Sequence, residues 1–141
     1  MKLLTRGRLP TGQTTVVAVR SAPPIHLGGI ECDRANRRVL RDGRQLHLSP
    51  TEFDLLAHLM LNVGRTFTRE HILAAVWGAE RVDLRTVDVT IGRLRRALNR
   101  SFYPDPIRCV RGRGYKFRED FEETHLRWMA RGRKKRHLRP E

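Results

Sequence analysis

The stretch VDLRTVDVTIGRLRRALNR, residues 82–100, determines the fold that the sequence predicts. At about 100° per residue, its apolar side chains follow the three-four spacing of a buried helix stripe: Leu84, Val87, Ile91, Leu94 and Leu98. The opposite side is mostly arginine: Arg85, Thr86, Val89, Arg93, Arg96 and Arg100. The pattern predicts a helix that is capped by Asp83, packs on a core through one face and presents cations on the other.

The cationic face of this helix indicates a polyanionic partner. Asp88 is its only acidic residue after Asp83, and Arg93 and Arg96 repel each other three positions apart. An α-helix fits the major groove of DNA, where arginine pairs with guanine and an apolar side chain can meet a thymine methyl group. We therefore expect DNA contacts along the helix: Arg85 and Thr86 at base edges, Val89 at a thymine methyl, and Arg93 and Arg96 at bases or phosphates.

Gly92 interrupts this helix on the border of its cationic side. A glycine in an exposed helix interior costs roughly 1 kcal/mol relative to alanine. Two interpretations stay open: the helix backbone approaches DNA closely at this position, or the glycine is tolerated without a function.

Two more helices are predicted before it. In SPTEFDLLAHLMLNVG, residues 49–64, Ser49 and Glu52 form a capping box ahead of an apolar face. A second helix runs through TREHILAAVWG from Thr68 and stops at Gly78. The short segment GAERVD joins it to the arginine-rich helix, which is the arrangement of a helix-turn-helix.

Strand-like segments flank the three helices. Residues 25–48 read as short alternating pieces, and Asp42-Gly43 marks a hairpin turn between two of them, which predicts a small antiparallel sheet. Residues 107–117, IRCVRGRGYKF, read as a second hairpin, and the glycines in its basic tip suit close approach to another molecule. We call this hairpin the wing.

The two ends of the chain have a different composition. Residues 1–24 form a basic arm without an acidic residue, in which TTVVAV is a candidate strand and SAPP a stiff linker. Beyond residue 119, the spacing of Phe121, His125 and Trp128 predicts a further helix. Residues 127–139 carry seven basic residues and no acid, so we expect this tail to be at least partly disordered when free.

Charge and composition narrow the function. The 141 residues carry a formal net charge of +14 and a pI near 11.4, which favours nucleic acid as a partner. Two distant cysteines and six histidines show no ligand spacing, so we expect no disulfide framework, metal or cofactor. No catalytic constellation appears and we expect no enzyme. With no long apolar run and no signal segment, we expect a cytoplasmic protein associated with the nucleoid.

Three of these segments together resemble a known family. LSPTEFDLLAHLMLNVGRTFTREHILAAVWG, LRTVDVTIGRLRRAL and IRCVRGRGYKF resemble the OmpR/PhoB-type winged-helix DNA-binding domain of bacterial two-component response regulators, a match that extends over residues 25–118. The resemblance implies an α+β winged helix-turn-helix: an N-terminal four-stranded antiparallel sheet, a three-helix core and a C-terminal β-hairpin wing. The flanking segments are then the arm, residues 1–24, and a helix with a basic tail, residues 119–141.

The resemblance also implies a function for particular positions. Residues 84–100 would enter the major groove through Arg85, Thr86, Thr90 and Arg93, and the wing would place a basic side chain in the minor groove, with Arg111, Arg113 and Lys116 as the candidates. The connection Gly78, Ala79, Glu80, Arg81, Val82, Asp83 matches a loop that in such proteins can contact RNA polymerase subunits. Relatives often bind direct repeats as head-to-tail pairs.

The sequence departs from the family pattern at several places. Thr90 stands where histidine is usual, Gly92 where a basic residue is common, and Cys109 where the wing often has threonine, so base preference is expected to differ. Arg113 at the wing tip strengthens the minor-groove interpretation, because narrow grooves attract arginine. The residues before the sheet contain no aspartate and are too few for a receiver domain. We therefore expect no receiver-type phosphorylation of this chain, which is either a stand-alone regulator or the output half of a longer one.

Three functions remain in competition. The leading one is a sequence-specific transcriptional regulator that binds double-stranded DNA. The second is a low-specificity, architectural nucleic-acid binder that relies on the arm and tail. The third is an adaptor that holds RNA polymerase or another protein through Phe121, Trp128 and Met129, although packing of these residues on the domain is the simpler interpretation.

Overall fold

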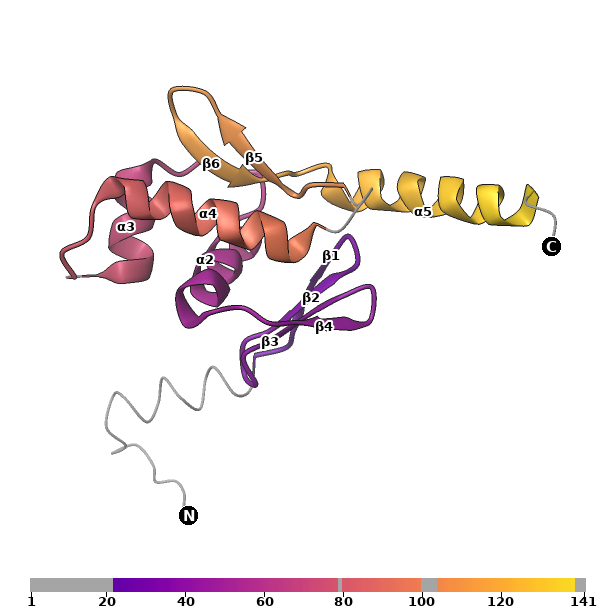
Figure 1. Ribbon diagram of the computed structural model, residues 1–141, viewed down its shortest axis with the longest axis horizontal. Helices are drawn as coiled ribbons and strands as arrows, with labels where there is room; N and C mark the ends of the chain where they lie inside the picture. Colours follow the sequence, from indigo (N-terminus) through magenta and orange to yellow (C-terminus); the bar gives the residue numbers. More distant parts are fainter. Residues whose placement is uncertain (1–21, 79, 100–103, 139–141) are drawn as a thin grey trace, which may run out of the picture.

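The computed structural model describes residues 22–78, 80–99 and 104–138, with side chains described as far as residue 132. The candidate strand TTVVAV in the arm lies outside these residues. In the described part, a four-stranded sheet, three helices and a two-stranded hairpin precede a long C-terminal helix (Figure 1). The predicted α+β winged helix-turn-helix is confirmed.

The N-terminal sheet is an antiparallel meander in the order β1-β2-β3-β4. Its strands are β1 Ile25–Leu27, β2 Ile30–Asp33, β3 Arg38–Arg41 and β4 Arg44–Leu46. The predicted turn connects β3 to β4, with Asp42 at φ 51° and Gly43 at φ 85°, both in the left-handed region that tight hairpins require. Alternate residues of the sheet, such as Ile30, Cys32 and Val39, face the core.

Three helices follow the sheet and pack on one another, with α2 also against β1: α2 Pro50–Leu61, α3 Arg69–Trp77 and α4 Leu84–Leu98. Each begins at a residue that the sequence predicts. Ser49 and Glu52 form the complete capping box of α2, the Thr68 side chain accepts from His71 N, and that of Asp83 accepts from Arg85 N. Satisfying these backbone N–H groups fixes where each helix begins, and thereby which face of α4 meets the core.

The wing consists of β5 Ile107–Val110 and β6 Gly114–Phe117. Phe67, in the segment between α2 and α3, extends it with a bridge in which the backbones of Phe67 and Tyr115 exchange two hydrogen bonds of 2.9 and 3.0 Å. Gly114, at φ 143°, is required here because a Cβ atom would overlap the carbonyl oxygen of Phe67. The wing is therefore held to the domain by backbone bonds.

A final helix, α5 Phe121–Leu138, follows the wing and extends away from the domain (Figure 1). The predicted helix after residue 119 is confirmed. The tail, which we expect to be at least partly disordered when free, is helical as far as Leu138, and residues 139–141 lie outside the described part of the chain. Arginine and lysine are good helix formers, and a first turn that is packed on the domain removes the cost of starting the helix.

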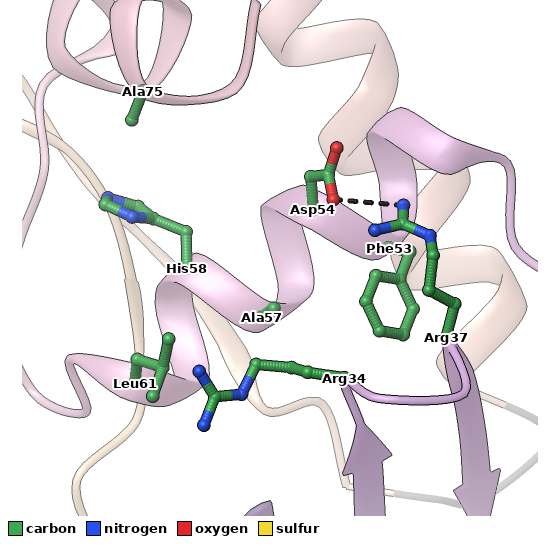
Figure 2. A pocket seen from close by; sticks show the side chains of 8 residues that line it. All are labelled: Arg34, Arg37, Phe53, Asp54, Ala57, His58, Leu61 and Ala75. Atoms are coloured by element: carbon green, nitrogen blue, oxygen red, sulfur yellow. Dashed lines mark hydrogen bonds and ion pairs between the residues drawn. The ribbon is translucent and has the colours of Figure 1, made fainter. Parts of the chain in front are cut away.

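Arg37 fixes the turn between β2 and β3 on α2. Its guanidinium lies 4.5 Å from the centroid of the Phe53 ring and forms a 3.0 Å ion pair with Asp54. These side chains border a hollow between the turn, α2 and α3, which Figure 2 shows with its complete lining: Arg34, Arg37, Phe53, Asp54, Ala57, His58, Leu61 and Ala75. No residue of this hollow belongs to the predicted DNA contacts.

Candidate nucleic-acid interface

The buried face of α4 orients its cationic face. Val87, Ile91, Leu94 and Leu98 are at most 1% exposed, as the three-four spacing predicts. Leu84, in the first turn, is only partly buried, and the fifth buried position is instead Thr90, 5% exposed. With this stripe against the core, Arg85, Arg93 and Arg96 point outward and are exposed.

The structure divides the arginines of this region into two groups. Some are tied to the protein: Arg69 to Asp88 at 2.7 Å, Arg95 to Asp105 at 3.3 Å and Arg118 to Asp120 at 3.1 Å. Other arginines have exposed guanidinium groups that make no hydrogen bond or ion pair in the described part of the chain, among them Arg85, Arg93 and Arg96 on α4, and Arg111 and Arg113 at the wing tip. These five side chains are available to an external anion.

The exposed face of α4 contains a shallow hollow with polar and apolar walls. Its lining is Asp83, Arg85, Thr86, Val89, Thr90 and Arg93. Val89 is 48% exposed, so its side chain is accessible for apolar contact with a partner. Five predicted contacts therefore lie together on this face.

Thr90 corrects the prediction in part. Its side chain turns toward the core, and its hydroxyl donates to the Thr86 carbonyl at 2.7 Å. Threonine on a helix commonly satisfies its hydroxyl in this way. Thr90 therefore contributes to the wall of the hollow, whereas its hydroxyl is already engaged within the helix. Arg100 and Ala79, also predicted contacts, lie outside the described residues.

Gly92 has room for a side chain. A Cβ atom built there would have a single neighbour within 4 Å, the Nη1 atom of Arg96 at 3.9 Å. Packing within the described part of the protein therefore gives no reason for a glycine at this position.

The wing presents its predicted residues unequally. Arg111 and Arg113 are exposed at the tip, in the turn that a 2.8 Å bond from Arg113 N to Val110 O closes. Lys116 lies lower, on the outer face of the hairpin, with its side chain 20% exposed and 3.0 Å from a carboxylate oxygen of Glu119. Lys116 is thus neutralised by a neighbour, while the two tip arginines are not.

Asp88 links the helix to the wing, a role that the sequence did not reveal. It accepts the Tyr115 hydroxyl at 2.6 Å and the Arg69 Nε–H at 2.7 Å, so that α3, α4 and β6 meet at one carboxylate. Burial by itself raises the pKa of Asp88, but hydrogen bonds from Tyr115 and Arg69, with the charge of Arg69, outweigh it and lower that pKa. Burial and the Asp88 hydrogen bond raise the pKa of Tyr115.

Arg41 fixes the other end of α4. It is 1% exposed, and its guanidinium donates to the carbonyls of Leu98 at 3.0 Å and Pro104 at 2.9 Å and to Asn99 Oδ1 at 3.2 Å. A cation at a helix C-terminus satisfies free carbonyls and opposes the helix dipole favourably. The sequence signal for this contact is an arginine at an inward-facing strand position.

The connection between α3 and α4 is exposed at Gly78, Glu80, Arg81 and Asp83, whereas Val82 packs against the core. Gly78 caps α3 with φ 63°, and Glu80 N donates to Trp77 O at 3.2 Å. Val82 thereby anchors a short loop whose charged side chains point to solvent.

Within the described residues, no group of His, Cys, Asp and Glu side chains is arranged to hold a metal ion. Both cysteines are free: Cys32 is buried and Cys109 is exposed on the wing. No helix of the described part combines the length and the apolar character that crossing a bilayer requires.

Fold and surface together define a winged-helix DNA-binding domain: a helix-turn-helix with a one-sided cationic second helix, followed by a hairpin with a basic tip. The chain belongs to the family described as "Transcriptional regulatory protein, C terminal", the OmpR/PhoB type, whose model matches residues 43–117.

Similar proteins carry the same domain. The chain is 54% identical over 92 residues to the phosphate regulon transcriptional regulatory protein PhoB of Rhizobium meliloti, covering 64% of this chain and 40% of that protein. Against Escherichia coli K12 PhoB, identity is 40% over 98 residues, or 69% and 43% of the two chains. The chain thus spans about two fifths of the length of these curated relatives.

Among solved structures, the Klebsiella pneumoniae RstA DNA-binding domain in complex with the RstA box matches with a TM-score of 0.61 and 34% identity. The match covers 69% of this chain and 98% of that one. The CpxR DNA-binding domain from E. coli matches with a TM-score of 0.60 and 30% identity, over 68% and 96% of the two chains.

Proposed function

We propose that this chain is a sequence-specific, double-stranded DNA-binding regulator of transcription, with α4 in the major groove and the wing at the minor groove. The observation that carries the proposal is the division of the arginines. Five exposed arginines on α4 and the wing tip lack partners within the described protein, while those behind them are paired. Exposed arginines without internal partners are free to pair with phosphates and base edges.

The roles of the side chains follow from their places on α4. Arg85 and Thr86, in the first turn, reach base edges, and the half-exposed Val89 meets a thymine methyl group. Arg93 and Arg96, further along, contact bases or phosphates. Arg111 and Arg113 extend from the wing tip into the minor groove, where a narrow groove concentrates negative potential.

Similar domains support this proposal. The matched RstA domain was solved in complex with its RstA box, a DNA partner of that protein, at 34% identity to this chain. On this basis we propose that the chain acts on chromosomal DNA in the cytoplasm and does no catalysis.

Selection of bound duplexes from a random pool, at two salt concentrations, tests the function. A sequence-specific regulator enriches one motif at both concentrations, and affinity for that motif exceeds affinity for random duplex by about 10³-fold or more. Binding without an enriched motif, with a steep salt slope, would instead identify the low-specificity, architectural binder.

Two partners remain proposals. The exposed loop around Glu80 and Arg81 suits contact with RNA polymerase, and its charges are separate from the α4 arginines. Substituting both residues by alanine should reduce transcription activation while leaving DNA affinity unchanged. Head-to-tail pairing predicts that two copies of the motif at a fixed spacing bind cooperatively, which a gel-shift titration on one- and two-copy duplexes measures.

A further inference from the structure

The base of α5 is fitted into the N-terminal sheet. Phe121 is 1% exposed and lies over Gly28, where a Cβ atom would overlap its ring. Gly28 N donates to Glu122 Oε1 at 2.6 Å. One turn later, His125 is 6% exposed and lies against Gly29, where a Cβ atom would be 2.7 Å from the imidazole. The two glycines of the β1–β2 turn thus form a seat for this helix.

Asp42 adds a contact from the neighbouring turn. Its carboxylate lies 3.3 Å from His125 Nε2, and its backbone N–H donates to Gly29 O at 2.8 Å. The β1–β2 and β3–β4 turns therefore both contact the first two turns of α5. The direction of the helix is set by the sheet, and α5 is an element of the domain rather than a flexible extension.

Charge is divided sharply along α5. The acidic residues at its start are all engaged: Glu119 with Lys116 at 3.0 Å, Asp120 with Arg118 at 3.1 Å, Glu122 with Gly28 N at 2.6 Å and Glu123 with Arg127 at 3.0 Å. From Thr124 to Leu138 the sequence contains six Lys and Arg residues and no acid. Every Lys, Arg, Asp or Glu residue in the part of the helix that extends beyond the seat is therefore a cation.

This cationic part is poorly stabilised as an isolated helix. Arginines at 127 and 131, four positions apart, repel each other, and Gly132 weakens the helix interior. The run RKKR at 133–136 adds further like charges. A surface of phosphates would convert this repulsion into attraction, because each contact releases condensed counterions.

We propose that α5 is a second, fixed DNA-binding element that contacts the phosphates of the duplex flanking the site bound by α4. This inference rests on the proposed function for the identity of the polyanion, which is then the duplex that α4 holds. Eighteen helical residues span about 27 Å, which is enough to carry the cations well beyond the seat. Because the seat fixes the direction of α5, the additional contacts fall on one flank of the site.

Removing charge tests the contact with phosphates. We test the basic run with a fourfold variant: Arg133→Gln, Lys134→Gln, Lys135→Gln and Arg136→Gln. The negative slope of log K against log salt should become shallower by about 3 to 4, at roughly 0.9 for each lost contact. The loss should be equal on the selected motif and on random duplex, so the preference between them is unchanged. The matched control exchanges Arg and Lys at the same four positions and should keep the wild-type slope. Equal salt slopes on duplex DNA for the wild type and the Gln variant overturn the proposal. A lower affinity of the Gln variant for single-stranded RNA would not rescue it.

A second variant tests the fixed direction. Inserting Gly-Ser-Gly-Ser after Met129 keeps the seat and the number of charges unchanged. The insertion breaks the rigid connection between the seat and the basic residues that follow it. Hydroxyl-radical footprinting on the selected motif should show extra backbone protection on one flank for the wild type, and weak protection on both flanks for the insertion variant. Identical footprints for the two proteins contradict a fixed helix.

The two proposals fail separately. If the wild type prefers no sequence, the proposed function is wrong. The salt slopes of the wild type and the Gln variant on random duplex still decide whether α5 binds phosphates. If the motif is preferred but the Gln variant keeps the wild-type slope, only the role of α5 falls.

Discussion

The hydroxyl of Tyr115, at the base of the wing, donates a 2.6 Å hydrogen bond to Asp88 in the middle of α4. The same carboxylate oxygen accepts from Arg69 on α3 at 2.7 Å. The two elements that we propose to contact DNA are therefore coupled through the only acidic residue within α4. We infer that this carboxylate has a structural role and is not a defect in the cationic face.

Tyr115→Phe should weaken the attachment of the wing to α4 without leaving a cavity in the core. The ring is 6% exposed and its packing is retained, so only the hydroxyl bond is lost. We expect the free energy of unfolding to fall by about 0.5–1.5 kcal/mol, measured by urea denaturation. We also expect faster hydrogen exchange at the amides of residues 107–117. Unchanged stability and exchange would show that the bond does not hold the wing.

Asp88→Asn should flatten the acid limb of the stability curve. The pKa of Asp88 in the folded protein is lower than its ordinary value of 3.8, which applies to the unfolded chain. The carboxylate therefore contributes its full stabilisation above the unfolded pKa, and this stabilisation is lost as the pH falls through the folded pKa. The stability difference between wild type and variant should be largest near pH 6 and shrink below about pH 4. Denaturant titrations at several pH values measure it, and a difference that stays constant down to pH 2 refutes the assignment.

Arg41→Met should be among the most destabilising single changes in the domain. The substitution keeps an apolar stem but leaves the carbonyls of Leu98 and Pro104 without their donor. We expect a loss of about 2–4 kcal/mol in the free energy of unfolding. The matched control is Arg37→Met: Arg37 is 51% exposed in its ion pair with Asp54, and the change should cost less than about 1 kcal/mol. Similar losses for the two variants would contradict the buried cap.

Gly92→Ala separates stability from binding. A methyl group would meet only the Arg96 Nη1 atom, at 3.9 Å, in the described part of the protein, so the variant should be more stable by about 0.5–1 kcal/mol. Nothing in the described structure calls for a glycine there, and we therefore expect the glycine to serve close approach of DNA, with affinity for the selected motif falling as stability rises. Thermal unfolding and fluorescence anisotropy on the same samples give both quantities. Unchanged affinity would favour a tolerated glycine without a function.

The sequence predicts those parts of the fold that depend on neighbouring residues. Caps at Ser49, Thr68 and Asp83, the turn at Asp42 and the buried stripe of α4 follow from spacing and local hydrogen bonding, and the structure confirms them. The prediction of the buried stripe was wrong at two positions: Leu84 is only partly buried, and Thr90 is buried. A helical wheel takes no account of the helix end, or of a threonine hydroxyl that donates to a carbonyl of the preceding turn.

The remaining features depend on residues far apart in the chain. Arg41 and Leu98 are 57 positions apart, and Gly28 and Glu122 are 94 apart, so no local pattern joins them. The same limit applies to the arginines: the sequence counts the cations, whereas only the fold separates Arg95, paired with Asp105, from its free neighbours Arg93 and Arg96. The order of the basic tail likewise depends on a seat formed by the distant β1–β2 turn.

We propose above that the exposed arginines of α4 distinguish one DNA sequence from another. The most direct measurement is the ratio of affinities for the selected motif and for random duplex, compared between Arg85→Ala and Arg44→Ala. Both residues are exposed, and the second lies in β4, outside the predicted DNA contacts. We expect Arg85→Ala to reduce the free-energy difference that this ratio measures by about 1–3 kcal/mol, and Arg44→Ala to leave it unchanged. Equal ratios for the two variants would contradict a role of Arg85 in distinguishing DNA sequences.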